Sequence, residues 1–221
     1  MTRVLIIGHS GGIGAALAAQ SAAAGAEVTG LSRSTDGLDL TDEASLTRLM
    51  GTLDGTYDTV WVVTGALELG PHRPEKALRA VTPEAAAAQF ALNALGPLLV
   101  LKHVLRLMPR DRPARFAALS ARVGSIGDNG LGGWYSYRAA KAALNQFIHT
   151  AAIEVARSHP QSVVVTLHPG TVDTGLTAKY RGDHAAVSPT EAAAHLTQVL
   201  DGLTPQDSGG FYDWRGKAVP W

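Results

Sequence analysis

The chain has 221 residues, of which 46% are hydrophobic and 17% charged, so it carries ample material for a core and disorder is excluded as its main state. Its 19 basic residues equal its 19 acidic ones, and the missing basic excess argues against a nucleic-acid partner. The absence of cysteine excludes disulfides and thiolate chemistry.

Apolar, β-rich runs alternate with alanine-rich stretches along the chain. Strands are predicted at 3–7, 27–31, 58–63, 115–119, 163–167 and 210–214, and helices at 13–24, 83–108, 134–158 and 189–200, with a short helix capped by Thr41. Strands that are apolar on both faces and alternate with helices predict a parallel sheet covered on both sides. We therefore expect one domain over 1–221, an α/β fold with a doubly wound parallel sheet in three layers.

Three further expectations concern the surroundings of the protein. The first residues run straight into a strand and do not resemble a signal peptide, and no apolar run is expected to span a bilayer, so we expect a cytoplasmic protein without a membrane partner. The histidines show no metal-ligand spacing, so no metal site is expected. The weakly periodic segment 172–188 is predicted to be a substrate lid.

A glycine-rich loop follows the first predicted strand and opens a helix. Gly8 should let the chain turn off the strand, Gly12 should let the backbone approach a phosphate, and Gly14 should let helix and strand pack closely. The helix N-terminus would then present free N–H groups to a pyrophosphate. This G-x-x-x-G-x-G loop, which includes Ser10 and Ile13, predicts a dinucleotide site; the alternative is a turn without a ligand.

The end of the second predicted strand indicates which dinucleotide is preferred. An enzyme that uses NAD usually places a carboxylate there, which would repel a 2′-phosphate. This chain has Ser32 and Arg33 instead, and a hydroxyl beside a guanidinium suits a phosphate. We therefore expect NADP(H) as cofactor rather than NAD(H), unless Arg33 is merely a solvated surface arginine.

Tyr137 and Lys141 lie four residues apart near the start of a long predicted helix, so they share a face. An ammonium beside a tyrosine should stabilise the phenolate and lower its pKa. Tyr137 could then protonate a carbonyl oxygen during hydride transfer, or accept the alcohol proton in the reverse direction. The neighbouring Tyr135 has no lysine four residues on.

These motifs, in this order, resemble the short-chain dehydrogenase/reductase family along nearly the whole chain, which implies a Rossmann fold that binds NAD(P). Tyr137 and Lys141 match the catalytic pair of the family, and Asn93 matches the asparagine that holds a proton-relay water; all three are also implied to contact the cofactor. The resemblance implies further cofactor contacts at Asp39 and Leu40 (adenine), at Thr64, Gly65 and Ala66, and at Pro169, Gly170, Val172 and Thr174 (nicotinamide amide and pyrophosphate). Thr64-Gly65-Ala66 departs from the Asn-Asn-Ala-Gly-like turn usual there.

The serine that hydrogen-bonds the substrate carbonyl in the family has no direct counterpart. The second position of the usual Ser-Ser pair is Ala121 here, after Ser120. We expect Ser125 to take over this role; Ser120 is the second candidate, and loss of the serine is the third.

The run around Tyr137 and the C-terminal residues are similar to the C-factor and sniffer-like carbonyl reductases. This resemblance implies an NADPH-dependent oxidoreductase that reversibly reduces a ketone or aldehyde. The alternative is a dinucleotide-binding regulatory or signalling protein whose reductase activity is incidental. The expected partners are a small carbonyl or alcohol substrate and further copies of the chain, as a homodimer or homotetramer paired through the two long helices.

Overall fold

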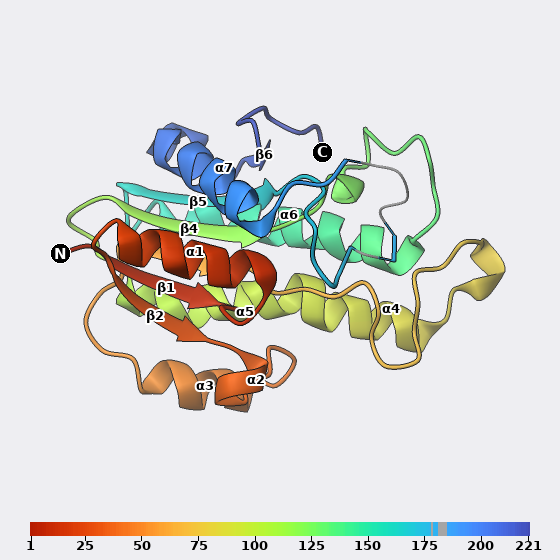
Figure 1. The fold of residues 1–221 in the computed structure, drawn as a ribbon, viewed down its shortest axis with the longest axis horizontal. Helices are drawn as coiled ribbons and strands as arrows, with labels where there is room; N and C mark the ends of the chain where they lie inside the picture. The colour runs from red at the N-terminus through yellow and green to blue at the C-terminus, as the bar shows by residue number, and fades with distance from the viewer. Residues whose placement is uncertain (178, 181–184) are drawn as a thin grey trace.

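A parallel sheet of six strands forms the centre of the computed structural model, which describes residues 1–177, 179–180 and 185–221 (Figure 1). Its strands are β1 (Arg3–Ile7), β2 (Glu27–Leu31), β3 (Thr59–Val62), β4 (Ala114–Leu119), β5 (Ser162–His168) and β6 (Phe211–Asp213). They lie in the order β2-β1-β3-β4-β5-β6. The chain moves from β1 to one side and then returns to the other, so the order reverses between β1 and β3, where a doubly wound sheet forms a crevice.

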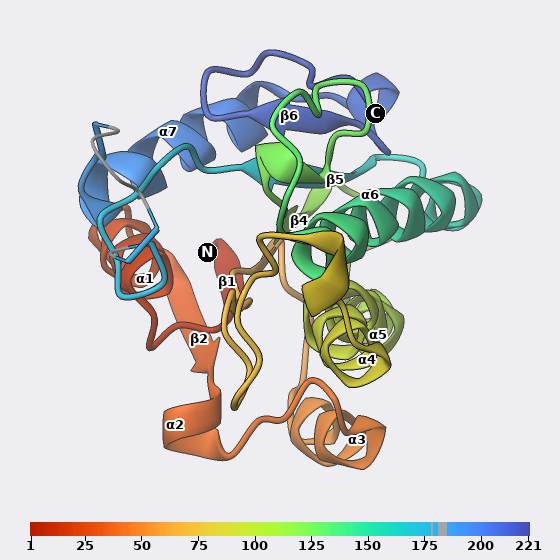
Figure 2. The same ribbon diagram turned by 90° about the vertical axis from the view of Figure 1, so that its right-hand side faces the viewer.

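Helices cover both faces of the sheet (Figures 1 and 2). One face carries α1 (Gly12–Ala23) and α7 (Pro189–Gly202), and the other carries α4 (Pro83–Phe90), α5 (Gly96–Val104) and α6 (Tyr135–Val155). The short α2 (Arg33–Asp36) follows β2, and α3 (Glu43–Gly51) packs on α5. This three-layer arrangement confirms the predicted fold class.

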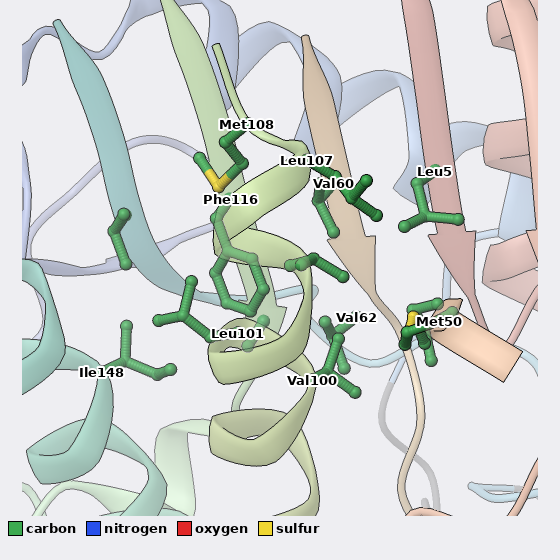
Figure 3. Close-up of a cluster of buried hydrophobic side chains, with 14 of the residues drawn as sticks. Leu5, Met50, Val60, Val62, Val100, Leu101, Leu107, Met108, Phe116 and Ile148 are labelled. Carbon is green, nitrogen blue, oxygen red and sulfur yellow. The ribbon is translucent and has the colours of Figure 1, made fainter. Parts of the chain in front are cut away.

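Alternate residues of each central strand enter opposite cores. In β1, Leu5 and Ile7 join the core beneath α5 and α6, whereas Val4 and Ile6 join the core beneath α1 and α7. Figure 3 shows the first core, where Phe116 of β4 lies beside Leu101 of α5. Full burial of each such side chain contributes about 1.5–3 kcal/mol, so the two cores hold the strand ends rigidly in register.

All six predicted strands are present, but several helix boundaries differ from the prediction. The predicted helix 83–108 is divided into α4, a π-helical turn over Ala91–Leu95, α5 and a 3₁₀ turn over Leu105–Leu107. Its predicted start is confirmed, since Thr82 Oγ1 accepts a hydrogen bond from the Ala85 amide at 3.2 Å. The cap of α3 is Asp42 rather than Thr41, because the Asp42 carboxylate accepts from the Ala44 amide at 2.9 Å.

The expectation about membrane-spanning length was wrong for one segment. The helical stretch Pro83–Leu107 has 25 residues and is long and apolar enough to cross a membrane. Buried helices of globular cores meet the same criterion, and 44% of its apolar window is buried inside the protein. Val100, Leu101 and Val104 contribute this buried surface to the core of the sheet.

The segment predicted as a lid leaves the sheet after β5. Its ends lie together, because Val172 forms a parallel bridge with Val187 and the Asp173 amide donates to Val187 O at 2.9 Å. Residues 178 and 181–184 of this segment lie outside the described residues. The described part is therefore a loop closed at its base beside the carboxyl end of β5.

Candidate active site

A cavity of about 930 Å³ lies where the carboxyl ends of the central strands meet α1 and α6. Its wall includes residues from several of the segments predicted to matter, among them Gly12, Thr64, Ser120, Tyr137, Lys141 and Gly170. The carboxyl ends of parallel strands beside a reversal of strand order are the usual ligand site of such sheets. The fold thus brings residues from distant parts of the sequence to one cavity.

The glycine loop has the geometry expected of a phosphate cradle. Gly8 has a φ of +96°, and a Cβ atom on Gly14 would lie only 2.2 Å from Gly8 O, so the turn and the helix touch. The N-cap of α1 is Gly11, no side chain caps the helix, and its first turn contains no acidic residue. Gly12 and Ile13 line the cavity, so uncapped N–H groups and the positive end of α1 are available to an anion.

In the turn after β2, the side chain of Ser32, which the sequence predicts to bind a phosphate, caps a helix instead. This side chain is buried and is the N-cap of α2, where Ser32 Oγ accepts from the Thr35 amide at 3.3 Å. Arg33 is exposed, which fits both a phosphate ligand and a solvated surface arginine, and Ser34 Oγ donates to Ser10 Oγ at 3.0 Å. Sequence reasoning missed Ser34, which the short helix α2 presents beside the glycine loop.

Asp36 is a carboxylate close to this turn, and it accepts hydrogen bonds from other residues of the turn. Its Oδ2 accepts from the Ser32 amide at 2.7 Å and from the Thr35 hydroxyl. Hydrogen bonds from Thr35 and from the Ser32 amide hold the pKa of Asp36 below its usual value. Asp36 therefore stabilises the turn as an anion through its Oδ2 atom.

The two residues expected at the adenine are already engaged by their neighbours. Asp39 Oδ1 accepts from the Thr41 amide and hydroxyl at 2.8 and 2.6 Å, which lowers the pKa of Asp39. Leu40 is buried, and a Cβ atom on Gly96 would lie 2.9 Å from Leu40 Cβ. Neither residue lines the 930 Å³ cavity, so their adenine contact stays a prediction.

Asn93 lies in the π-helical turn and is completely buried. Its Oδ1 accepts from the Ala66 amide at 3.1 Å, and its Nδ2 donates to Ala66 O at 2.9 Å and to Gln89 Oε1 at 2.6 Å. Both amide hydrogens are therefore used, and the side chain fixes the turn over Thr64, Gly65 and Ala66 beside the cavity. Because a water can also be held by donating to an oxygen, the role of Asn93 in holding a relay water stays a prediction.

Tyr137 and Lys141 lie together on the cavity wall, 7% and 3% exposed. Lys141 Nζ donates to Leu119 O at 2.8 Å and lies 5.8 Å from the centre of the Tyr137 ring. Burial raises the pKa of Tyr137 and lowers the pKa of Lys141 to about 7. The expectation that Lys141 depresses the pKa of Tyr137 is wrong for the protein without cofactor, since loss of hydration disfavours both charged forms. Tyr137 is thus protonated at neutral pH.

The structure separates the two candidate serines. Ser125 Oγ accepts from the Asp128 amide at 3.1 Å, and Ser125 does not line the cavity, contrary to the sequence-based expectation. Ser120 does line it, is 4% exposed, and its Oγ has no partner among the described residues. The sequence misled here because Ser125 is closer to Tyr137 along the chain, whereas Ser120 directly follows β4 and lines the cavity.

Two more polar atoms without a partner in the described part of the chain belong to residues of this wall. They are Thr64 Oγ1 after β3 and His168 Nδ1 at the end of β5, on either side of β4 and Ser120. Burial lowers the pKa of His168 to about 4, so its imidazole is neutral at pH 7. Buried polar atoms usually have partners, and three that line one cavity indicate a ligand site. Sequence reasoning missed His168, whose only signal is its place before Pro169-Gly170.

The loop after β5 closes the cavity on the side of the glycine loop. Pro169, Gly170, Val172 and Thr174 all line the wall. Gly170 has a φ of +80°, and a Cβ atom on Gly12 would lie 3.0 Å from Thr174 Cγ2. This loop therefore meets the N-terminus of α1, as expected of residues that hold the same cofactor.

Comparison with known proteins relates this geometry to one family. A profile of short chain dehydrogenases matches residues 2–185. The 1-hydroxy-2-glutathionyl-2-methyl-3-butene dehydrogenase of Rhodococcus sp. is 33% identical over 188 residues, which cover 84% of this chain and 79% of that protein. The C-signal protein of Myxococcus xanthus is 37% identical over 136 residues, which cover 61% of this chain and 78% of that protein. A crystal structure of a putative short-chain dehydrogenase/reductase from Burkholderia multivorans with bound NADP is 25% identical, with a TM-score of 0.80, and the match covers 100% of this chain and 99% of that one.

Proposed function

We propose that this chain, which belongs to the short-chain dehydrogenase family and is an oxidoreductase, uses NADPH to reduce a ketone or aldehyde reversibly to an alcohol. The observation that carries the proposal is the placement of Tyr137. It is a buried, protonated phenol one helical turn before a buried lysine, on the wall of a cavity that also includes the uncapped N-terminus of α1.

The residues of the cavity and of the turn after β2 suit a dinucleotide. The free N–H groups at Gly12 and Ile13 would receive the pyrophosphate, and the exposed Arg33, with Ser34 and Ser10, would receive the 2′-phosphate. The unpartnered Thr64 Oγ1 and His168 Nδ1 supply hydrogen-bonding groups deeper in the cavity. The Burkholderia relative with bound NADP supports the choice of cofactor. When bound, NADPH supplies the hydride.

The protein itself would manage the proton and the orientation of the substrate. Tyr137, whose phenol is protonated at neutral pH, would donate its phenolic proton to the carbonyl oxygen as the hydride arrives. Ser120 Oγ lies on the same wall without a partner among the described residues and would orient the carbonyl. Lys141, which donates to Leu119 O and lies 5.8 Å from the centre of the Tyr137 ring, would hold the cofactor ribose.

The substrate would enter past apolar side chains. Trp134, Leu131 and Tyr180 line the cavity, and Leu131 is 96% exposed at its rim. The Rhodococcus relative is named as a dehydrogenase of a hydroxylated compound, which agrees with an alcohol–carbonyl pair. We therefore propose a small-molecule carbonyl as substrate.

The second candidate function is a dinucleotide-binding regulatory protein in which turnover is incidental. Ala121 at the usual serine position and the similarity to the C-signal protein favour it. A panel of aldehydes and ketones, followed by the absorbance of NADPH, separates the two. The reductase proposal predicts consumption of NADPH with at least one class of carbonyl. Tight binding of NADPH without any consumption would support the regulatory function instead.

A further inference from the structure

The helix that carries Tyr137 begins without a capping side chain of its own. The N-cap of α6 is Trp134, which forms no side-chain capping bond and has a φ of +52°. No other described residue besides glycine has a positive φ. Such a backbone conformation costs on the order of 1–3 kcal/mol and persists only where neighbouring groups impose it.

Glu75 forms hydrogen bonds with the residues on which this conformation depends, although it lies 61 residues earlier in the sequence than Ser136. Its carboxylate accepts from the Ser136 amide at 3.2 Å and from the Ser136 hydroxyl, and its carbonyl oxygen accepts from the Trp134 amide at 2.6 Å. Glu75 is only 5% exposed. A carboxylate at a helix N-terminus satisfies otherwise unpaired N–H groups and interacts favourably with the helix dipole.

The segment that leads to Glu75 is itself anchored at several points. The Gln89 side chain donates to Leu67 O at 2.9 Å, and Asn93 holds Ala66. Leu69 and His72 then exchange two backbone hydrogen bonds of 3.0 Å, which close a tight turn just before Glu75. The carboxylate therefore reaches α6 from a fixed platform rather than from a loose loop.

The turn to which Glu75 is hydrogen-bonded carries the proposed proton donor and part of the cavity wall. Tyr137 follows Ser136 directly, and the Trp134 ring packs edge-on against Tyr137 at 6.2 Å and against Tyr180 at 5.6 Å. Trp134 and Tyr137 both line the cavity. A shift of this turn would move the proton donor and the wall that faces the substrate together.

We propose that Glu75 is a positioning residue that sets the first turn of α6, and through it the phenol of Tyr137 and the indole of Trp134. The inference rests on the proposed function for its effect on turnover, but not for its effect on the turn. Misplacement of a reacting group by about 1 Å can cost roughly 10²-fold in rate, so the effect should fall on kcat rather than on cofactor affinity.

The test compares Glu75→Ala, Glu75→Gln and Ser136→Ala with the control Glu84→Ala. Glu84 is an exposed carboxylate in the first turn of α4. Amide hydrogen exchange over residues 133–141 reads the turn directly. Calorimetry gives the Kd of NADPH. The ratio of kcat/KM for a small and a bulky ketone reports whether the shape of the cavity wall has changed.

Glu75→Ala should speed exchange in this segment by about tenfold or more, and lower kcat by a similar factor, with the Kd of NADPH within about twofold of the wild-type value. The preference between the two ketones should change by about threefold or more. Glu75→Gln keeps an acceptor for the Ser136 amide and should lie between wild type and Glu75→Ala. Glu84→Ala should match wild type throughout.

Unchanged exchange in Glu75→Ala, or a kcat within about twofold of the wild-type value, would overturn the inference. If Glu75→Ala does not fold, Glu75→Gln and Ser136→Ala decide it by the same readouts. Absence of carbonyl turnover in the wild-type protein would contradict the proposed function. Amide hydrogen exchange would still show whether Glu75 stabilises the first turn of α6.

Discussion

Burial of the ionisable side chain of Lys141 lowers the stability of the fold, but it gives the cavity a group that exchanges a proton near neutral pH. Lys141 is buried, its ammonium group donates to Leu119 O, and burial lowers its pKa from 10.5 to about 7. Near neutral pH the ammonium and the amine are therefore both populated. A single group that exchanges a proton this readily can accept or return one beneath Tyr137.

This burial predicts a pH-dependent gain in stability for Lys141→Met. Below pH 7 the lysine is charged in both states and the full burial cost applies, on the order of 3–5 kcal/mol. Between pH 7 and 10.5 the unfolded chain binds more protons than the folded one, so the stability of the wild-type protein rises with pH. The free-energy cost of burying the lysine decreases over the same range. Denaturant unfolding should show the variant more stable at pH 6, with an advantage that shrinks towards pH 10. The exposed Lys76→Met is the control, and an advantage that is constant with pH would contradict the account.

The two serines predict opposite mutational results. Ser120→Ala should lower kcat/KM by about tenfold to hundredfold, the value of a hydrogen bond to a developing charge, because its hydroxyl lines the cavity. Ser125→Ala removes only the bond from the Asp128 amide and should leave turnover nearly unchanged. Steady-state kinetics on one ketone tests this. A large loss only in Ser125→Ala would restore the role inferred from the sequence.

Arg33 predicts the preference between cofactors. If its guanidinium binds the 2′-phosphate with a charge-assisted hydrogen bond of about 1.5–3 kcal/mol, Arg33→Ala should weaken NADPH by about tenfold to hundredfold and leave NADH unchanged. Arg48→Ala, also a surface arginine, serves as control. Equal weakening of both cofactors in Arg33→Ala would show that Arg33 is only a surface charge.

At the scale of elements, the contact between the glycine loop and α1 is the tightest of the cofactor region. A Cβ atom on Gly14 would lie 2.2 Å from Gly8 O, whereas a Cβ atom on Gly51 in α3 meets nothing within 4 Å. Gly14→Ala should therefore lower the free energy of unfolding by about 1–3 kcal/mol and weaken NADPH, despite the better helix propensity of alanine.

The matched substitution Gly51→Ala separates strain from propensity. It adds the same methyl group to a helix without a clash and should leave stability unchanged or raise it by up to about 1 kcal/mol. Thermal unfolding of both variants provides the comparison. Similar changes in the two would mean that the close approach of Gly14 to Gly8 does not constrain the loop.

The elements themselves could be predicted from local patterns. Alternating or continuous apolar runs located all six strands, and Thr82 and Ser188 marked the starts of α4 and α7. The π-helical turn at Asn93 was not predictable, because the turn is fixed by Ala66, far away in the sequence. The cap that Glu75 places on α6 was missed for the same reason.

At the scale of the molecule, the reversal of strand order between β1 and β3 locates the cavity. It joins α1, the ends of β3 to β5 and the start of α6, which no single stretch of sequence contains. Pairing of copies through the two long predicted helices, which correspond to α4 with α5 and to α6, as a homodimer or homotetramer stays a prediction. Phe90 and Ile153, 41% and 56% exposed, lie on these helices.

The central claim, that Tyr137 protonates a carbonyl while NADPH reduces it, is tested most directly with NADPH deuterated at its transferable position. Mass spectrometry of the product alcohol should find deuterium on the carbinol carbon for wild type and for Tyr135→Phe, the exposed neighbour in the same turn. Tyr137→Phe should form this product about 10²–10⁴-fold more slowly while the Kd of NADPH is unchanged. An alcohol without the label, or a Tyr137→Phe rate close to that of wild type, would contradict the account.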